Sequence, residues 1–324
     1  MAYKVLITAP YMQPHVDRFR PVFEEHDVNI VVPSVEERME EDDLLEWIDD
    51  VDGVICGDDR FTERVLDQAS RLKVISKWGT GIDSIDQEAC AERDIAVCNT
   101  PDAFSEPVAD SVMGYVLCFA RNLPWMDRAM KDGVWKKIPG FALREATLGI
   151  IGVGDVGKTV ARRANAFGMR LLGNDLVEMP ADFLESCPIE MVDRETLLSE
   201  SDFISLNTDL NDTSFHLMDA DGFAQMKETA VIINTSRGPV IDETALVDAL
   251  QSGGIRGAAL DVFEEEPLPD ESPLRTMDQV LLAPHNANSS PEAWEHVHQN
   301  TIRNLLDVLT EHPPSLEQIE QMTE

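Results

Sequence analysis

The fold of this 324-residue chain is decided by the segment Thr147-Leu148-Gly149-Ile150-Ile151-Gly152-Val153-Gly154-Asp155-Val156-Gly157. Its first half is a short apolar run typical of a buried strand, and apolar residues then recur at helical spacing as far as Phe167. Three glycines with the spacing G-x-G-x-x-G join the two patterns. The glycines alone are a weak signal, but between a strand and a helix they predict the phosphate-binding turn of a Rossmann dinucleotide site.

Each glycine of this turn has its own steric task. Gly152 permits the tight turn, Gly154 lets a pyrophosphate approach the backbone, and Gly157 lets helix and strand pack closely. Asp155 and Val156 lie at the N-terminus of the expected helix, which offers amide hydrogens and a partial positive charge to the phosphates. We therefore expect these five residues to bind the cofactor.

The next predicted strand ends at Asp175, eighteen residues beyond Gly157. A carboxylate at this position hydrogen-bonds the ribose hydroxyls and repels a 2′-phosphate. The alternative is an ordinary loop carboxylate, which is common in so acidic a chain, but the place at the end of a strand favours the functional interpretation. The predicted cofactor is therefore NAD and not NADP.

Strand-like runs alternate with helical patterns along the chain, which predicts an α/β fold with parallel sheets. The expected strands are Lys4–Thr8, Val28–Val32, Gly53–Cys56, Val74–Ser76 and Ile95–Cys98, then Thr147–Ile151, Arg170–Asn174, Phe203–Leu206, Ala230–Asn234, Ala258–Asp261 and Val280–Ala283. The dinucleotide turn opens the second series. The first series therefore belongs to another domain.

Two helical patterns mark the crossings between these domains. One runs from about Ser105 to Arg121 and the other from Pro291 to Thr310. If the later helix returns to the first domain, the cofactor domain is an insertion. We expect an NAD-binding domain over residues 101–287 and a substrate domain made of residues 1–100 and 288–324.

The net charge of the chain limits the classes of partner that it is expected to bind. Asp and Glu total 61 against 26 Lys and Arg, giving a net charge of −35, and lysine is scarce even among the cations. Such a field repels nucleic acid and anionic lipid, so neither is expected to bind. A dispersed acidic surface is typical of proteins from salt-loving organisms, where salt screens the self-repulsion. We expect a halophilic source, with an ordinary acidic cytosolic protein as the alternative.

The remaining composition indicates a cytoplasmic protein. No apolar run is long enough to cross a bilayer, and the N-terminus has only a strand-length apolar run where a signal peptide needs a longer one. The five cysteines are an odd number and contain no C-x-x-C pair. They indicate neither a disulfide framework nor a zinc site, and no metal site is predicted.

Reactive side chains gather in three segments that follow later strands. They are Asn234-Thr235-Ser236-Arg237-Gly238, Asp261-Val262-Phe263-Glu264-Glu265-Glu266-Pro267 and Pro284-His285-Asn286. The carboxyl ends of parallel strands line the ligand crevice of a doubly wound sheet. We expect these segments to meet there.

With these segments, the chain resembles the D-isomer-specific 2-hydroxyacid dehydrogenases. The N-x-x-R-G, D-V-F-x-x-E-P and P-H elements appear in order, and the resemblance runs from the loop Trp78–Asp83 to Ser290. It implies two Rossmann-like doubly wound domains, with the NAD-binding domain inserted into a flavodoxin-like substrate domain. It also implies interconversion of a 2-oxo acid and a D-2-hydroxy acid by hydride transfer.

The resemblance assigns a catalytic role to three residues. Arg237 would bind the carboxylate and carbonyl of the substrate through its fixed guanidinium fork. His285 would donate or accept the proton, and Glu266 would favour its protonated form. A surface arginine and a solvated glutamate run are the alternatives. The other six histidines are expected at surface positions: His15, His26, His216, His296, His298 and His312.

The resemblance also implies the contacts of cofactor and substrate. Asp261 would meet the nicotinamide carboxamide, and Thr208, Thr235 and Ser236 would lie along the cofactor. In the first domain the backbone of Gly79, Thr80 and Gly81 would receive the substrate carboxylate. Trp78 would wall the pocket or, as an equal alternative, pack in the core. Lys77 is expected to be a solvated residue at a strand end, with an anionic substrate tail as the alternative.

The chain departs from the family pattern at informative positions. Cys56 stands where members acting on phosphoglycerate tend to carry an arginine, which puts that substrate in doubt. Asn286 and Asn288 replace a glycine-bearing run after the histidine. Family members usually dimerise through the cofactor domain, so a homodimer is expected. The alternatives are 3-phosphoglycerate dehydrogenase as the specific enzyme and an NAD(H)-binding corepressor-like regulatory protein.

Overall fold

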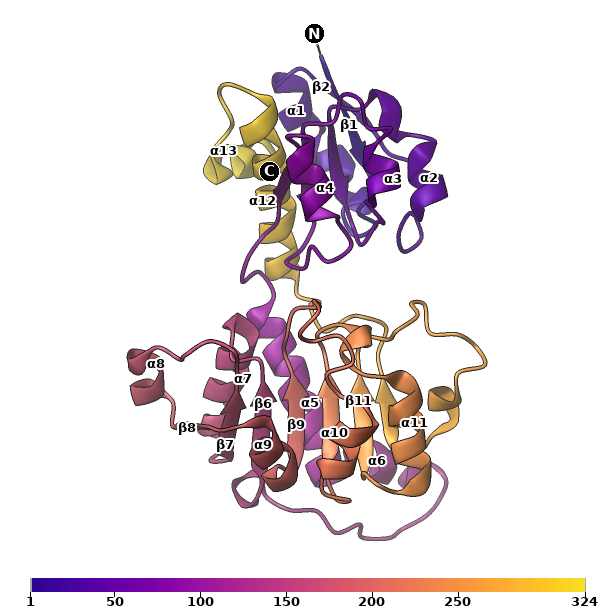
Figure 1. The fold of residues 1–324 in the computed structure, drawn as a ribbon, viewed down its shortest axis with the longest axis vertical. Helices are drawn as coiled ribbons and strands as arrows, with labels where there is room; N and C mark the ends of the chain where they lie inside the picture. The colour runs from indigo at the N-terminus through magenta and orange to yellow at the C-terminus, as the bar shows by residue number, and fades with distance from the viewer. Residues whose placement is uncertain (1, 324) are drawn as a thin grey trace. The chain divides into compact units, whose positions relative to one another are not determined.

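The computed structural model describes residues 2–323 and divides into two compact α/β units (Figure 1). Unit 1 comprises the chain up to Ala103 and from Ser290 onward, and unit 2 comprises Phe104–Ser289. All strand pairs in both units are parallel, which confirms the predicted fold class. The expected domain borders, 100/101 and 287/288, and the assignment of the substrate to unit 1 stay predictions.

Unit 1 holds a five-stranded sheet in the order β2-β1-β3-β4-β5, the flavodoxin-like order. Its strands are β1 (Tyr3–Ile7), β2 (Val28–Val31), β3 (Gly53–Cys56), β4 (Val74–Lys77) and β5 (Ala96–Cys98). Its helices are α1 (Val16–Glu25), α2 (Glu41–Leu45), α3 (Glu63–Leu66), α4 (Gln87–Glu92), α12 (Pro291–Leu309) and α13 (Leu316–Thr323).

Helix α12 completes unit 1 although it comes from the far end of the chain. It packs on β3, β4 and β5, and α13 packs against α1 (Figure 1). The Ser76 hydroxyl donates to the Thr301 carbonyl at 2.8 Å. A Cβ at Gly53 would lie 2.9 Å from Leu305, so the glycine lets the helix lie close to the sheet. The first domain therefore depends on the last segment of the sequence.

Unit 2 holds a seven-stranded sheet in the order β12-β11-β10-β9-β6-β7-β8. Its strands are β6 (Thr147–Ile151), β7 (Arg170–Asn174), β8 (Ile189–Met191), β9 (Phe203–Leu206), β10 (Val231–Asn234), β11 (Gly257–Leu260) and β12 (Val280–Leu282). The strand order reverses between β6 and β9, where a ligand crevice forms in such sheets. The sequence analysis missed β8, because Glu190 interrupts its apolar run, whereas the equally short edge strands β5 and β12 are apolar throughout.

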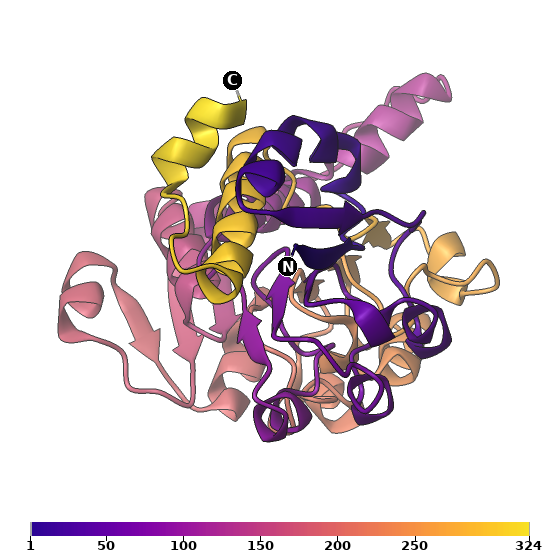
Figure 2. The same ribbon diagram turned by 90° about the horizontal axis from the view of Figure 1, so that it is seen from above.

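Helices cover both faces of this sheet. They are α5 (Ser105–Arg121), α6 (Leu123–Lys131), α7 (Asp155–Ala166), α8 (Ala181–Ser186), α9 (Arg194–Glu200), α10 (Ala220–Gln225) and α11 (Glu243–Ser252). The neighbouring residues Ile232 and Ile233 enter two different cores, one on each face. Helix α6 has no buried residue and projects from the rest of unit 2 (Figure 2). Within residues 2–323, no helix has the length and apolarity that a membrane span requires.

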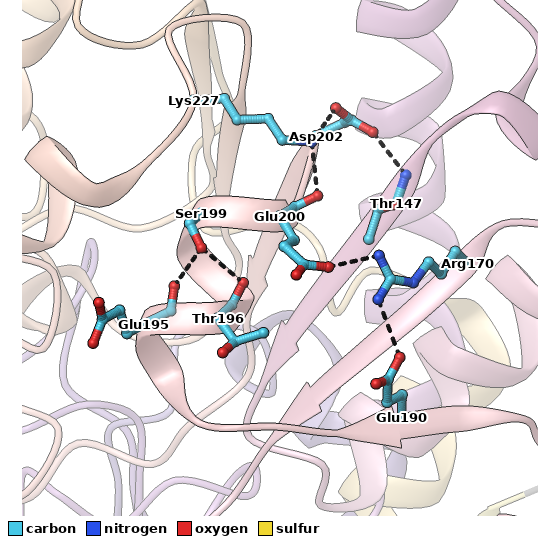
Figure 3. A network of polar contacts seen from close by, with 9 residues as sticks. All are labelled: Thr147, Arg170, Glu190, Glu195, Thr196, Ser199, Glu200, Asp202 and Lys227. Carbon is cyan, nitrogen blue, oxygen red and sulfur yellow. Dashed lines mark hydrogen bonds and ion pairs between the residues drawn. The ribbon is translucent and has the colours of Figure 1, made fainter.

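A polar network ties together the amino ends of the strands of unit 2 (Figure 3). Asp202 accepts from the Thr147 amide at 2.8 Å and from Lys227 Nζ at 2.9 Å. Arg170 bridges Glu200 and Glu190 at 2.7 and 3.1 Å. These contacts lie where β6, β7 and β9 begin. The reactive side chains follow the ends of their strands and therefore lie at the opposite, carboxyl edge of the sheet.

Candidate active site

The phosphate turn is built between β6 and α7 as the sequence predicts. Gly152 has a φ of +83°, and a Cβ there would lie 2.6 Å from the Asn207 carbonyl oxygen. A Cβ at Gly157 would lie 2.1 Å from the Gly152 carbonyl oxygen. A side chain at Gly152 would push the turn away from the loop after β9, and a side chain at Gly157 would push α7 away from the turn.

The same turn has room and polar groups for a dinucleotide. A Cβ at Gly154 would meet nothing within 4 Å, so a phosphate can reach the backbone. Gly154 caps α7, whose first amides, including those of Asp155 and Val156, have no acceptor within the helix. Thr208 Oγ1, beside Gly152, is buried and makes no hydrogen bond among residues 2–323. These features fit an anionic, hydroxyl-bearing ligand.

Asp175 lies directly against this turn. Its Oδ2 accepts from the Val153 amide at 2.6 Å, and its Oδ1 accepts from the Val177 amide at 2.9 Å. An ionised carboxylate has about four acceptor sites, so each oxygen can accept a further hydroxyl donor. The geometry is compatible with the predicted ribose contact.

The loop that carries Arg237 is held by Asn234, a buried amide at the end of β10. Asn234 Oδ1 accepts from the amide and hydroxyl of Ser236 at 3.1 and 2.8 Å, and its Nδ2 donates to the Arg237 carbonyl at 2.8 Å. The sequence analysis gave Asn234 no role. The sequence signal for such a role was a polar residue at the end of a buried strand, three positions before the arginine. Thr235 is half-buried in this loop.

His285 and Glu266 form the predicted pair. His285 Nδ1 lies 2.9 Å from Glu266 Oε2, and Glu266 Oε1 accepts from the Phe263 amide at 2.9 Å. The amide therefore fixes one oxygen of the carboxylate and leaves the other to the imidazole.

Asp261 shapes the turn that presents the histidine. Its buried carboxylate accepts from the amides of Asn286 and Ala287 at 2.9 and 2.8 Å, and its carbonyl accepts from the His285 amide at 2.7 Å. His285 has a φ of +49°, a left-handed conformation that costs energy in most residues. Burial raises the pKa of Asp261, although these hydrogen bonds oppose the shift. The predicted contact of Asp261 with nicotinamide stays a prediction.

Gly238 brings the Arg237 loop against the Glu266 loop. A Cβ at Gly238 would lie 1.8 Å from the Phe263 carbonyl oxygen and 2.5 Å from the Glu264 nitrogen. Only glycine permits this contact. The structure thus places Arg237, Glu266 and His285 in three successive loops at one edge of one sheet.

In unit 1 the loop after β4 is fixed by its neighbours. Gly79 has a φ of +131° and accepts from the Thr100 amide at 2.9 Å. The Thr80 hydroxyl donates to the Thr100 carbonyl at 3.0 Å. Gly81 follows in the same loop, which is the predicted receptor of the substrate carboxylate.

Trp78 packs in unit 1, which was one of its two alternatives, and His298 corrects the expectation of a surface position. Trp78 is buried, and its Nε1 donates to His298 Nδ1 at 2.9 Å. His298 is buried rather than at the surface, because it shares the inner face of α12 with Val297 and Thr301. Burial lowers its pKa to about 4, which keeps Nδ1 an acceptor. In unit 2, His216 is also expected to be a surface residue without a partner, but its Nε2 lies 2.6 Å from Glu264 Oε1.

Lys77 is also buried, against the expectation of a solvated lysine. Its Nζ donates to Asp58 at 2.9 Å, and this partner offsets the cost of burying the charge. The Cys56 side chain is fully buried, and burial raises the pKa of its thiol. The neighbouring Asp59 is buried and accepts from the Met39 and Gly57 amides. Across the described chain, no group of three or more metal-ligating side chains occurs.

Comparison with known proteins agrees with this geometry. The family model for the NAD-binding domain of D-isomer-specific 2-hydroxyacid dehydrogenases matches residues 113–287. The chain is 41% identical over 294 residues to D-3-phosphoglycerate dehydrogenase from Methanocaldococcus jannaschii, covering 90% of this chain but only 54% of that protein. It is 35% identical to glyoxylate reductase from Thermococcus onnurineus, covering 98% of this chain and 96% of that one.

A solved structure shows the same likeness. The D-lactate dehydrogenase of Aquifex aeolicus, complexed with NAD and lactic acid, matches with a TM-score of 0.86 and 26% identity over 98% of both chains. The predictions of the family, the NAD cofactor and the class of reaction are confirmed. The chain belongs to the D-isomer-specific 2-hydroxyacid dehydrogenases, NAD-dependent oxidoreductases that interconvert 2-oxo and 2-hydroxy acids.

Proposed function

We propose that this protein reduces a short, unphosphorylated 2-oxo acid such as glyoxylate, with His285, Glu266 and Arg237 as its catalytic residues. The observation that carries the proposal is the distance of 2.9 Å between His285 Nδ1 and Glu266 Oε2. The loop of Glu266 packs against Gly238, the residue after Arg237. Bound NADH supplies the hydride. The chain's own residues bind the acid, polarise its carbonyl and move one proton.

The proton is the task of His285. Its Nδ1 is engaged by Glu266, so proton exchange with the substrate falls to Nε2. The carboxylate stabilises the imidazolium, which donates to the carbonyl oxygen as the carbon is reduced. In the oxidative direction the neutral ring accepts the same proton.

Arg237 has the charge and shape for the acid itself. Its planar guanidinium stays protonated and can hold a carboxylate while polarising the neighbouring carbonyl. The Asn234 anchor supports this role because it fixes the backbone from which the side chain extends. In unit 1, the amides of Gly79, Thr80 and Gly81 are proposed to bind the substrate carboxylate as well, and Trp78 is proposed to line that loop.

The cofactor is proposed to lie along the phosphate turn. The backbone of Gly152, Gly154, Asp155, Val156 and Gly157 would hold its phosphates. The ribose would meet Asp175, and the rest of the dinucleotide would be lined by the side chains of Thr208, Thr235, Ser236 and Asp261.

The charges of unit 1 favour an unphosphorylated substrate. A phosphate is best held by arginine or lysine. Lys77, the buried cation next to the glycine loop, is already neutralised by Asp58, and Cys56 adds no charge. The relative named glyoxylate reductase covers nearly the whole chain, whereas the phosphoglycerate dehydrogenase is far longer.

The test is NADH oxidation at high KCl over glyoxylate, hydroxypyruvate, pyruvate, phenylpyruvate and phosphohydroxypyruvate. We expect glyoxylate or hydroxypyruvate to exceed phosphohydroxypyruvate in kcat/KM by at least about tenfold. A preference for the phosphorylated acid would instead identify 3-phosphoglycerate dehydrogenase activity. No turnover on any acid would favour the corepressor-like alternative.

We propose a homodimer formed through unit 2. Support comes from apolar side chains that are exposed on and after α6, namely Leu123, Met130, Val134 and Trp135, the last 86% exposed. Light scattering should give twice the monomer mass. Trp135→Asp together with Met130→Asp should halve it, while an unchanged mass would place the interface elsewhere.

We also propose a cytoplasmic protein from a salt-loving organism. Its five cysteines are all unpaired thiols, as in reducing compartments, and its net charge is −35. Self-repulsion at this charge is screened by salt. The melting temperature should rise along a KCl series, and a maximum in dilute buffer would contradict the proposal.

A further inference from the structure

His216 stands where three loops of unit 2 meet. These loops follow β9, β10 and β11, and the last two carry Arg237 and Glu266. The His216 amide donates to the Pro239 carbonyl at 2.8 Å, two residues from Arg237. Backbone contacts therefore join the His216 loop to the arginine loop.

The side chain of His216 reaches the third loop. Its Nε2 lies 2.6 Å from Glu264 Oε1, two residues before Glu266. The backbone at His216 is left-handed, with a φ of +47°, and the ring stacks on Phe215 with centroids 4.0 Å apart. The contact with Glu264 and the stacking on Phe215 thus fix the direction of the imidazole.

The loop that His216 holds determines where the Glu266 carboxylate lies. Phe263 donates its amide to Glu266, and its carbonyl packs on Gly238. A shift of Glu264 would move both of these contacts, because it adjoins Phe263 in the chain. The effect of His216 would therefore reach His285 through Glu266.

Charged side chains surround His216 on the neighbouring elements. Glu264 and Glu265 face Glu243, whose Oε2 accepts from the Glu264 amide at 3.3 Å. Arg194 of α9 contacts the Leu217 carbonyl on the other side.

We propose that His216 is a positioning residue, which through Glu264 holds the 263–266 loop so that Glu266 faces His285. This inference rests on the proposed function of His285. It concerns residues that touch neither the substrate nor the cofactor in that proposal.

The test compares His216→Ala, His216→Gln and Glu264→Ala with the wild type, with His312→Ala as the control. His312 is an exposed histidine of unit 1. We expect His216→Ala to lower kcat about tenfold and to leave NADH affinity within about twofold of the wild type. His216→Gln keeps an N–H donor and should recover at least half of that loss.

The pH profile separates positioning from a purely structural effect. A carboxylate next to the ring favours imidazolium, so its displacement should move the midpoint of kcat/KM to lower pH by about 0.5 or more in His216→Ala. The double variant with Glu264→Ala should be no worse than either single variant.

Failure of the proposed function and failure of this inference give different results. If the wild type reduces none of the acids, the proposed function fails. If the wild type is active but His216→Ala retains its kcat and its pH midpoint, or the two single effects add, this inference alone is overturned.

Discussion

Replacing Gly238 by alanine should separate the two loops that carry the catalytic pair and the arginine. The added Cβ would lie 1.8 Å from the Phe263 carbonyl oxygen, whereas real Cβ contacts essentially never fall below 3.0 Å. The obstructing atom is backbone, so the loops must part by at least 1.2 Å. A misplacement of about 1 Å at a catalytic group can cost about 100-fold in rate. We expect a loss of that order in kcat.

The fold should survive this change. Overpacking costs about 1–3 kcal/mol, against a total stability of about 5–15 kcal/mol for a domain. The assay is NADH oxidation with glyoxylate, together with NADH binding by fluorescence and a thermal melt. Gly114→Ala is the matched control, because its Cβ would meet nothing within 4 Å. It should keep full activity and gain about 0.5–1 kcal/mol in a helix. A Gly238→Ala enzyme with kcat within about twofold of the wild type would refute the reasoning.

Three further predictions address other parts of the molecule. His285→Ala should lose about 100- to 10,000-fold in kcat while NADH still binds, and near-normal turnover would remove His285 from the proton transfer. Gly154→Ala should weaken NADH affinity at least about tenfold without lowering the melting temperature, because its surroundings are empty; an unchanged affinity would show that the phosphates lie elsewhere. The pKa of His298 is lowered to about 4, so the unfolded chain binds more protons below pH 6.5 and stability is lost as pH falls toward 4. Urea unfolding of His298→Gln should therefore show a smaller difference between pH 7 and pH 5 than the wild type, by about 2 kcal/mol.

The fold could be predicted because its signals are local. The apolar runs and the turn from Gly152 to Gly157 each depend on residues adjacent in sequence, and the structure reproduces them as β6 and α7. β8 was missed because Glu190 stands between its two apolar residues, so that it lacks the continuous apolar run of the other strands. The burial of His298 and Lys77 was missed because it depends on segments far away in the chain.

The candidate site shows the same division. Arg237, Glu266 and His285 were found because each sits in a recognisable segment. Asn234 and Gly238 belong to the same N-x-x-R-G segment as Arg237, but the contact of Gly238 with Phe263 joins loops that follow different strands. His216 lies in a loop after a third strand, and no spacing in the sequence relates it to Glu264. Asp261 was assigned to the cofactor by resemblance, whereas both oxygens of its carboxylate accept from amides of the histidine turn.

Helix α12 has a consequence for synthesis of the protein. The ribosome makes β1 to β5 first and then all of Phe104–Ser289 before it reaches the helix that covers β3, β4 and β5. At about 5–20 residues per second, these 186 residues take roughly 10–40 s. During that interval unit 2 can fold, while the apolar face of unit 1 that will receive Leu305 stays uncovered. Termination after unit 2 but before α12 would leave a chain with a complete cofactor domain and a unit 1 whose apolar face is exposed.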